Sequence, residues 1–374
     1  MNLKNSMILA NMMSQKPKIM YATIKGTLTE NDGVFSGFST SNYLEVQGLY
    51  DFSQPFEVCL KMRLTGSPNA SGFFRAAGSN LGSFGCLVGA GHNIGVWSRD
   101  SEDNYIMNGV YTPNNSFLEN TDYWVKMCFT GTQYIIYLST DNINFTKYTL
   151  ISSSKNIGIN KTIKIGVTAG TQYFNGSIDI NNSYIKLGST KYKLQAVVGY
   201  TIVGSPTIVD GVVSGFSTSN YLLLGANVPY SNNFEMVFKI TTGSSFSSTN
   251  TIFEGSSSNN GLSIAINTSK YLYVSAGNGS WIVNTSGTTV LSANTTYYVK
   301  FSCKNNVYKL ELSTDNVNWN TEISVESSSV LVTTSAKSIG YSTRFSGRVF
   351  RGSIDMNETY IKINNKLWFN GQQA

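Results

Sequence analysis

The segment GFSTSNYL, residues 37–44, occurs again without change at residues 215–222. A chance match of this length is very improbable, and longer stretches of the chain also match. The matched pairs are 23–44 with 201–222, 120–145 with 294–319, and 176–187 with 352–363. A period this long indicates duplication of a whole domain, because solenoid repeats span only about 20–50 residues. We therefore expect an N-terminal arm (1–19), a first domain (20–195) and a second domain (196–374).

The composition supports two folded domains whose surfaces carry few charges. The chain has 374 residues, enough for two separate cores. Its hydrophobic content of 41% argues against disorder, and only 13% of its residues are charged. The net charge of +6 is spread along the chain as isolated Lys and Arg, without a cluster that would follow a phosphate backbone or a membrane surface. We predict no nucleic-acid partner and no membrane insertion.

Cysteine and histidine usage argues against structural disulfides and zinc. The four cysteines show no paired spacing and are not equivalent between the copies, and His92 is the single histidine. The N-terminal apolar run is interrupted at Asn11, which is too early for a secretory signal. No apolar stretch approaches the roughly 18 residues that span a bilayer. We therefore expect four free thiols and folding in a reducing cytoplasm.

The matched segments have the period of β-strands. In FEVCLKMRL (56–64) apolar residues alternate with others, and the second copy keeps this phase. Gly131 lies in a hairpin connection, and the Asp-Asn pairs of LSTDNINF and LSTDNVNW mark a second hairpin in each copy. GSIDINNSYIKL (176–187) is interpreted as strand, Asn-rich turn, strand. The sequence predicts an all-β protein of two double-sheet sandwich or jelly-roll domains, in which GFSTSNYL forms a turn that leads into a strand.

These segments resemble a known family. DGVFSGFSTSNYL, FEVCLKMRL, YLSTDNINF and the closing GSIDINNSYIKL or GSIDMNETYIKI are similar to concanavalin A-like (laminin G-like) jelly-roll domains. In particular they resemble tandem modules of fibre and appendage proteins of tailed bacteriophages. The resemblance covers nearly the whole chain and implies the fold. It does not choose between lectins, glycan-binding modules and glycosidases.

Catalytic and metal-binding patterns are weak in this sequence. Retaining glycosidases need two carboxylates about 5–5.5 Å apart, and the nearest candidates, Glu102 and Asp103, would point to opposite faces of a strand. We interpret them as a solvated turn and His92 as a surface-loop residue. Asp141 and Asp315 are expected to fix hairpins, with calcium binding as the alternative. No catalytic residue, cofactor or metal site is therefore predicted.

Glycan binding is best sought where the copies diverge, at residues 66–119 and 243–293. Sugars stack on aromatic rings while amide, carboxylate and guanidinium groups bind their hydroxyls. The candidates in the first copy are Trp97, Arg99, Asp103, Asn104 and Tyr105. Those in the second copy are Tyr271, Tyr273, Asn278, Trp281 and Asn284. For any single one of Trp97, Tyr273 and Trp281, however, we favour packing on an inner sheet face over sugar binding.

The arm carries an apolar cluster outside the repeat, made of Met7, Ile8, Leu9, Met12 and Met13. Met side chains adapt to irregular grooves, so these residues are candidates for docking to another protein. The alternatives are a disordered tail or a first strand.

Three functions compete. The leading hypothesis is a non-enzymatic virion structural protein, a phage fibre or a head or tail decoration, assembled in the host bacterial cytoplasm. Its lectin-like domains would present a surface to host glycans, its arm would bind other virion proteins, and the chain would form a homotrimer. The second hypothesis is a purely structural capsid or tail component without sugar binding. The third, a polysaccharide-degrading enzyme, lacks suitable acids.

Overall fold

The computed structural model describes residues 18–66, 68, 71–77, 83–168, 172–257, 259–332, 337–345 and 347–373. These residues form strands and turns without any helix, so the predicted all-β fold class is confirmed. No helix that could cross a membrane is present in this part of the chain. The fold divides into two compact units, Met1–Ala196 and Val197–Ala374, and the predicted division lay between 195 and 196.

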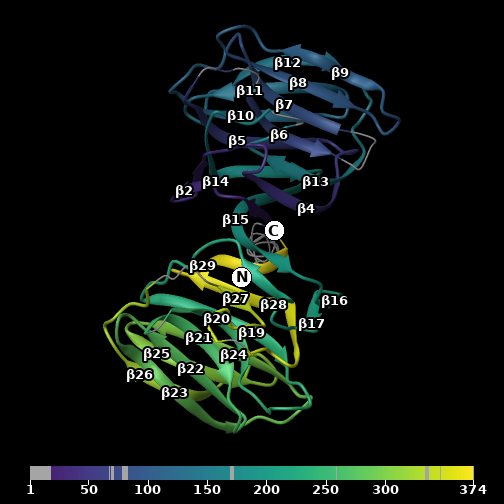
Figure 1. Ribbon diagram of the computed structural model, residues 1–374. Coiled ribbons are helices and arrows are strands. Elements are labelled where there is room, and N and C mark those ends of the chain that lie inside the picture. The colour runs from purple at the N-terminus through teal and green to yellow at the C-terminus, as the bar shows by residue number, and fades with distance from the viewer. Residues whose placement is uncertain are drawn as a thin grey trace, which may run out of the picture. The chain divides into compact units, whose positions relative to one another are not determined.

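The first unit is a sandwich of two antiparallel sheets. Its first sheet runs in the order β1 (Lys18–Lys25), β4 (Tyr43–Asp51), β13 (Ile159–Ile165), β6 (Ser71–Ala77), β7 (Ser83–Gly89), β8 (Asn93–Arg99) and β9 (Tyr105–Tyr111). Its second sheet runs β2 (Thr29–Asn31), β3 (Val34–Ser36), β14 (Gly176–Leu187), β5 (Phe56–Leu64), β10 (Asp122–Phe129), β11 (Gln133–Ser139) and β12 (Thr146–Ser152). Figure 1 shows β6, β7 and β8 side by side.

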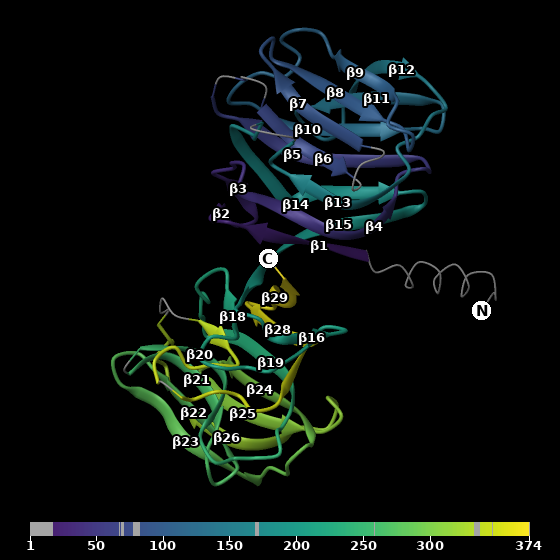
Figure 2. The ribbon, with the colours of Figure 1, turned by 45° about the vertical axis from the view of Figure 1, so that its right-hand side comes forward.

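The second unit repeats this strand order. One sheet runs β15 (Thr190–Val203), β18 (Tyr221–Leu224), β27 (Ser338–Ile339), β20 (Asn250–Ser257), β21 (Asn260–Ile266), β22 (Tyr271–Gly277) and β23 (Trp281–Val290). The other runs β16 (Thr207–Val209), β17 (Val212–Ser214), β28 (Ser353–Ile363), β19 (Asn233–Thr241), β24 (Thr296–Lys304), β25 (Val307–Ser313) and β26 (Asn320–Glu326), and β29 (Lys366–Gln373) also pairs with β28. In Figure 2, β20 to β23 follow one another in this order.

Strand β15 belongs to both units. Its residues 190–193 pair with β14 in the first unit. Residues 200–203 pair with β18 in the second unit, where they take the place that β1 has beside β4. The repeated domains are thus joined by one strand rather than by a loop.

Each unit has its own hydrophobic core between its two sheets. The predicted alternation in β5 is confirmed, since its five apolar positions are buried. They are Phe56, Val58, Leu60, Met62 and Leu64. Cys59 is also buried, although it faces the opposite side of the sheet from this core row.

The repeated segment GFSTSNYL forms a turn followed by a strand, as predicted. The hydroxyl of Ser39 accepts a hydrogen bond from the backbone N–H of Asn42 at 3.0 Å. The side chain of Asn42 in turn accepts one from the N–H of Thr27 at 3.0 Å, and Asn220 binds Ser205 in the same way. The following strands begin at Tyr43 and Tyr221. The segment is kept in both copies because it holds the entry to β4 and to β18.

The two predicted hairpins are also confirmed. Gly131 has a φ of 97° in the β10–β11 connection. Asp141 closes the β11–β12 turn by accepting hydrogen bonds from the N–H groups of Ile143 and Asn144, both at 2.8 Å. Asp315 binds Val317 and Asn318 at the same distances. These hydrogen bonds hold the pKa of Asp141 and of Asp315 well below its usual value.

One sequence prediction of secondary structure was wrong. GSIDINNSYIKL does not turn back on itself; it forms the single strand β14, whose register against β5 shifts between Asp179 and Tyr184. Asp179 accepts a hydrogen bond from the N–H of Asn182 at 3.1 Å, and the Asn181 side chain donates to the carbonyl oxygen of Asp32 at 2.8 Å. The polar residues therefore stabilise a β-bulge, which resembles a turn in composition.

The N-terminal arm falls mostly outside the described residues. Strand β1 begins at Lys18, so the last two residues that we assigned to the arm belong to the first unit. The candidate docking residues Met7, Ile8, Leu9, Met12 and Met13 lie outside the part of the chain that the structure describes.

Candidate functional site

The outer face of β6 to β9 in the first unit carries the largest group of predicted site residues. Along β8, Ile94 and Val96 are buried in the core, so Trp97 and Arg99 alternate onto the opposite face. Tyr105 and Tyr111 of β9 pair with Arg99 and Gly95 and are 52% and 45% exposed. We call this surface, with Arg75, Trp97, Arg99, Tyr105 and Tyr111, the β6–β9 face.

Two aromatic rings on this face pack over glycines. A β-carbon on Gly95 would come within 2.5 Å of the Tyr111 ring, and one on Gly89 within 2.9 Å. The Trp97 indole lies over Gly109 in the same manner, at 3.3 Å from the corresponding position. The Trp97 and Tyr111 rings meet edge to face with centroids 5.6 Å apart. Their planes are 85° apart, so at most one of the two rings can lie parallel to the sheet; we call this pair the aromatic platform.

Three of the predicted residues form a polar cluster beside this platform. The Arg99 guanidinium donates to Asp103 at 2.7 Å and to the hydroxyl of Tyr105 at 2.6 Å. It also lies 4.2 Å from the centroid of the Tyr105 ring, which places a cation over that ring face. The cluster fixes the position of Arg99, and Asp103 neutralises its charge.

The structure confirms that the adjacent acids belong to a turn. Residues 101–104 are exposed in the β8–β9 connection, and Asp103 has a φ of 67°. Asp100 holds the turn by accepting hydrogen bonds from the N–H groups of Glu102 and Asn104, at 3.0 and 2.9 Å. The Asn104 side chain donates to Glu102 at 3.4 Å, within the turn. Asn104 therefore contributes to the loop rather than to the platform.

A row of register partners that begins with two basic residues crosses the same face. Lys164 of β13 pairs with Arg75 of β6, Arg75 pairs with Gly85 of β7, and Gly85 pairs with Trp97. Among the described residues, the space above Gly85 is open, since the nearest atom to a β-carbon there is a backbone oxygen at 3.9 Å. Arg75 and Trp97 thus flank a gap of one strand's width, about 4.8 Å on either side of β7.

In the second unit the predicted residues do not form one site. Tyr271 and Tyr273 share the outer face of β22, and the Tyr273 hydroxyl donates to the Asn284 side chain. Trp281, 39% exposed, pairs with Gly277 at the far end of β22, and Asn278 lies in the turn there. The favoured interpretation of inner-face packing is wrong for Trp97, Tyr273 and Trp281, because none of them belongs to the buried core clusters.

Sequence reasoning missed Arg75 and Tyr111, although both lie inside the divergent segment 66–119. A signal for them was present. Gly85, Gly89, Gly95 and Gly109 recur in neighbouring strands, where glycine often marks the close approach of another group. Here that group is an aromatic ring, at Gly89, Gly95 and Gly109.

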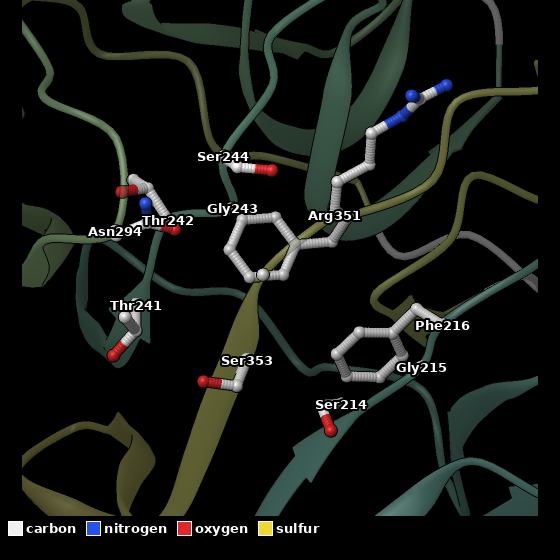
Figure 3. Close-up of a pocket in the computed structure, with 12 residues that line it drawn as sticks. Ser214, Gly215, Phe216, Thr241, Thr242, Gly243, Ser244, Asn294, Arg351 and Ser353 are labelled. Carbon is white, nitrogen blue, oxygen red and sulfur yellow. The ribbon is translucent and has the colours of Figure 1, made fainter.

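A hollow of about 420 Å³ lies in the second unit and was not predicted. Its lining is Ser214, Gly215, Phe216, Thr241, Thr242, Gly243, Ser244, Asn294, Phe350, Arg351, Gly352 and Ser353. Figure 3 shows the hydroxyls of Ser214, Ser244 and Ser353 around it, whereas the guanidinium of Arg351 extends away from the Phe216 ring. Arg351 is the single charged residue of this lining. The hollow offers hydroxyls and backbone groups, without a carboxylate or imidazole for acid–base chemistry.

Within the described residues no group of three or more His, Cys, Asp or Glu side chains could hold a metal ion. His92 lies in the β7–β8 turn with a φ of 53°, and its Nε2 is 3.2 Å from a carboxylate oxygen of Glu119. These two residues form a surface contact, as expected for a loop histidine.

No known family model and no curated protein sequence matches this chain. Solved structures do resemble it. Domains LG4-5 of the mouse laminin alpha1 chain are 11% identical, with 96% of this chain and 95% of that chain covered and a TM-score of 0.32. A carbohydrate-binding module, CBM66 from Bacillus subtilis, is 15% identical over 42% of this chain and 92% of its own, with a TM-score of 0.28. The receptor-binding domain of a botulinum neurotoxin C/D mosaic serotype is 11% identical over 84% and 87%, with a TM-score of 0.34. Similarity at this level does not identify a ligand.

Proposed function

We propose that the chain is a non-enzymatic binding protein whose first unit recognises a saccharide on the β6–β9 face. The observation that carries this proposal is the aromatic platform of Trp97 and Tyr111, an edge-to-face pair that packs over glycines on the outer face of the sheet. The C–H face of a sugar ring stacks on such rings, while neighbouring polar groups bind its hydroxyls. Arg99, held by Asp103, supplies fixed donors beside the platform.

The test is saccharide binding by the full chain on a glycan array, followed by calorimetry with the best ligand. Trp97→Ala should weaken binding at least tenfold, about 1.4 kcal/mol. Trp124→Ala is the matched control, because Trp124 lies on β10 in the other sheet, where Lys61 is 5.1 Å from its ring centroid. Binding that is lost equally in both variants, or in neither, contradicts the proposal.

A gentler variant tests the platform without removing a ring. Gly95→Ala places a methyl group where the Tyr111 ring lies, 2.5 Å from its nearest carbon. Tyr111 is exposed and can move aside, so the unit should stay folded while the two rings separate. We expect weaker saccharide binding with a nearly unchanged melting temperature. Unchanged affinity would show that the packing of Tyr111 over Gly95 is unimportant for binding.

The proposed setting is a bacteriophage particle, in which the chain is a fibre or a head or tail decoration. Support for this setting is the sequence resemblance alone. Peptides of the chain should be found by mass spectrometry in purified particles, and labelled antibodies should place them by electron microscopy. A chain that is present in particles but binds no saccharide would favour the purely structural alternative. Analytical ultracentrifugation tests the expected trimer.

A further inference from the structure

Arg75 and Lys164 place two like charges directly opposite one another on the β6–β9 face. They are register partners of β6 and β13, an arrangement that is unfavourable without a neighbouring carboxylate. Glu45 of β4 is the register partner of Lys164 on its other side, and its carboxylate is paired with Lys25 at 3.1 Å. Lys164 lies against Tyr43, 3.3 Å from its hydroxyl oxygen and 4.5 Å from its ring centroid. Arg75 is half-buried and has no carboxylate partner within the described ranges. Its guanidinium is thus available to an anion from outside.

The duplicated unit shows that the fold does not require these charges. There, Phe253 and Ile339 pair as Phe74 and Ile165 do in the first unit, which aligns the two sheets. Beside them, Glu254 stands at the position of Arg75 and Ser338 at that of Lys164.

The same row continues differently in the second unit. Glu254 is followed across the sheet by Ser263 and Ser275, where the first unit has Gly85 and Trp97. Glu254 is completely buried, and it accepts hydrogen bonds from the hydroxyls of Ser263 at 3.1 Å and Ser342 at 2.9 Å. This position is closed in the second unit and open in the first.

We infer that the ligand of the β6–β9 face is an acidic saccharide, bearing a carboxylate or sulfate group. This inference rests on the proposed function. One sugar ring stacks on Trp97, and the acidic substituent of that ring or its neighbour lies over Gly85 and reaches Arg75. The guanidinium binds such an oxyanion through two parallel N–H donors, and Lys164 adds a second positive charge. Gly85 matters because any side chain there would fill the space that the substituent needs.

The experiment compares acidic saccharides with their neutral counterparts on the full chain. The probes are tetragalacturonate and its methyl ester, 3′-sialyllactose and lactose, and a heparin tetrasaccharide with its desulfated, carboxyl-reduced form. At 50 mM salt, at least one acidic member should bind tenfold or more tightly than its partner, and this preference should shrink at 0.5 M salt. The sugars that show the preference distinguish carboxylate from sulfate recognition.

Three variants assign the preference to Arg75. Arg75→Gln should abolish it and leave the weaker binding of the neutral sugar, whereas Arg75→Lys should retain part of it. Lys147→Gln is the control, since it removes the same charge from β12 in the other sheet. No acidic preference in any pair, or a preference that Arg75→Gln leaves intact, overturns the inference. In either case, neutral binding that still depends on Trp97 would leave the proposed function standing; no binding at all would reject both.

Discussion

The ring of Phe38 lies against Gly166 so closely that a β-carbon on this glycine would come within 2.0 Å of it. Phe216 and Gly340 repeat the contact in the second unit, with a corresponding distance of 2.1 Å. Both glycines have positive φ values, 88° and 86°. The Phe of GFSTSNYL thus packs against a glycine beyond strand β13 or β27, which joins two distant parts of each copy.

Gly340→Ala should therefore destabilise the second unit strongly. The added methyl group must displace a buried ring and also adopt a left-handed backbone, which together cost about 2–5 kcal/mol. Gly347→Ala is the matched control, with a φ of 84° but no atom of the described residues within 4 Å of the added β-carbon beyond its chain neighbours, and it should cost only about 1–2 kcal/mol. Chemical denaturation followed by tryptophan fluorescence measures both. Equal losses of unfolding free energy in the two variants would show that the left-handed backbone alone, without the Phe216 contact, accounts for the requirement for glycine at position 340.

A second prediction concerns the turn carboxylate Asp141. Its pKa lies below the unfolded value of about 3.9 because the N–H groups of Asn144 and Ile143 bind the ionised form. The carboxylate therefore contributes stability that is fully present above this unfolded pKa and is lost as the pH falls towards the folded pKa. Asp141→Asn should lower the melting temperature of the first unit at pH 7, and this difference should narrow between pH 5 and pH 2.5. A difference that stays constant with pH would contradict the assignment.

The sequence could predict those parts of the fold that depend on local patterns. The alternation in β5, the Asp141 hairpin and the turn before Tyr43 each require only neighbouring residues, and all three are confirmed. The β14 bulge was missed because its asparagines have turn-like composition, while β5 keeps the chain extended through cross-strand pairing.

The candidate site was predicted only in part, for a similar reason. Trp97, Arg99 and Tyr105 are close in sequence and on adjacent strands, so a local search could group them. Arg75 joins them only through the register of β6 and β7, and Tyr111 only through its position above Gly95. In the second unit, Tyr273 of β22 stands at the position of Gly95 of β8. The aromatic ring at this place therefore comes from β22, whereas in the first unit it comes from Tyr111 on β9. Such exchanges depend on register, which a single sequence does not reveal.

A third prediction concerns the thiols, which are all free and buried. Burial raises the pKa of Cys59 to about 11 and that of Cys128 to about 12, so little of either is thiolate at pH 8. Maleimide should react slowly with the folded protein and should add four labels per chain after denaturation without a reductant. Mass spectrometry counts the labels. Two or fewer in the denatured chain would reveal a disulfide and contradict folding with free thiols.

The last prediction uses the contrast between Glu254 and Arg75, which occupy corresponding positions in the two units. Glu254→Ala would leave the hydroxyls of Ser256, Ser263 and Ser342 without their shared acceptor in a closed environment. Since an unsatisfied buried polar group costs about 1–3 kcal/mol, we expect the second unit to lose about 3 kcal/mol or more. Glu254→Gln keeps an acceptor and the side-chain volume and should cost less.

Arg75→Gln provides the comparison, because Arg75 is only half-buried and open to solvent. It should change the stability of the first unit by no more than about 0.5 kcal/mol. Denaturation curves of the full chain, with hydrogen exchange to assign each transition to its unit, measure the three variants. If Glu254→Ala destabilises the protein no more than Arg75→Gln does, the hydrogen bonds from the three serine hydroxyls to Glu254 do not stabilise the second unit. The proposed difference between a closed position in one copy and an open anion site in the other would then lose its structural basis.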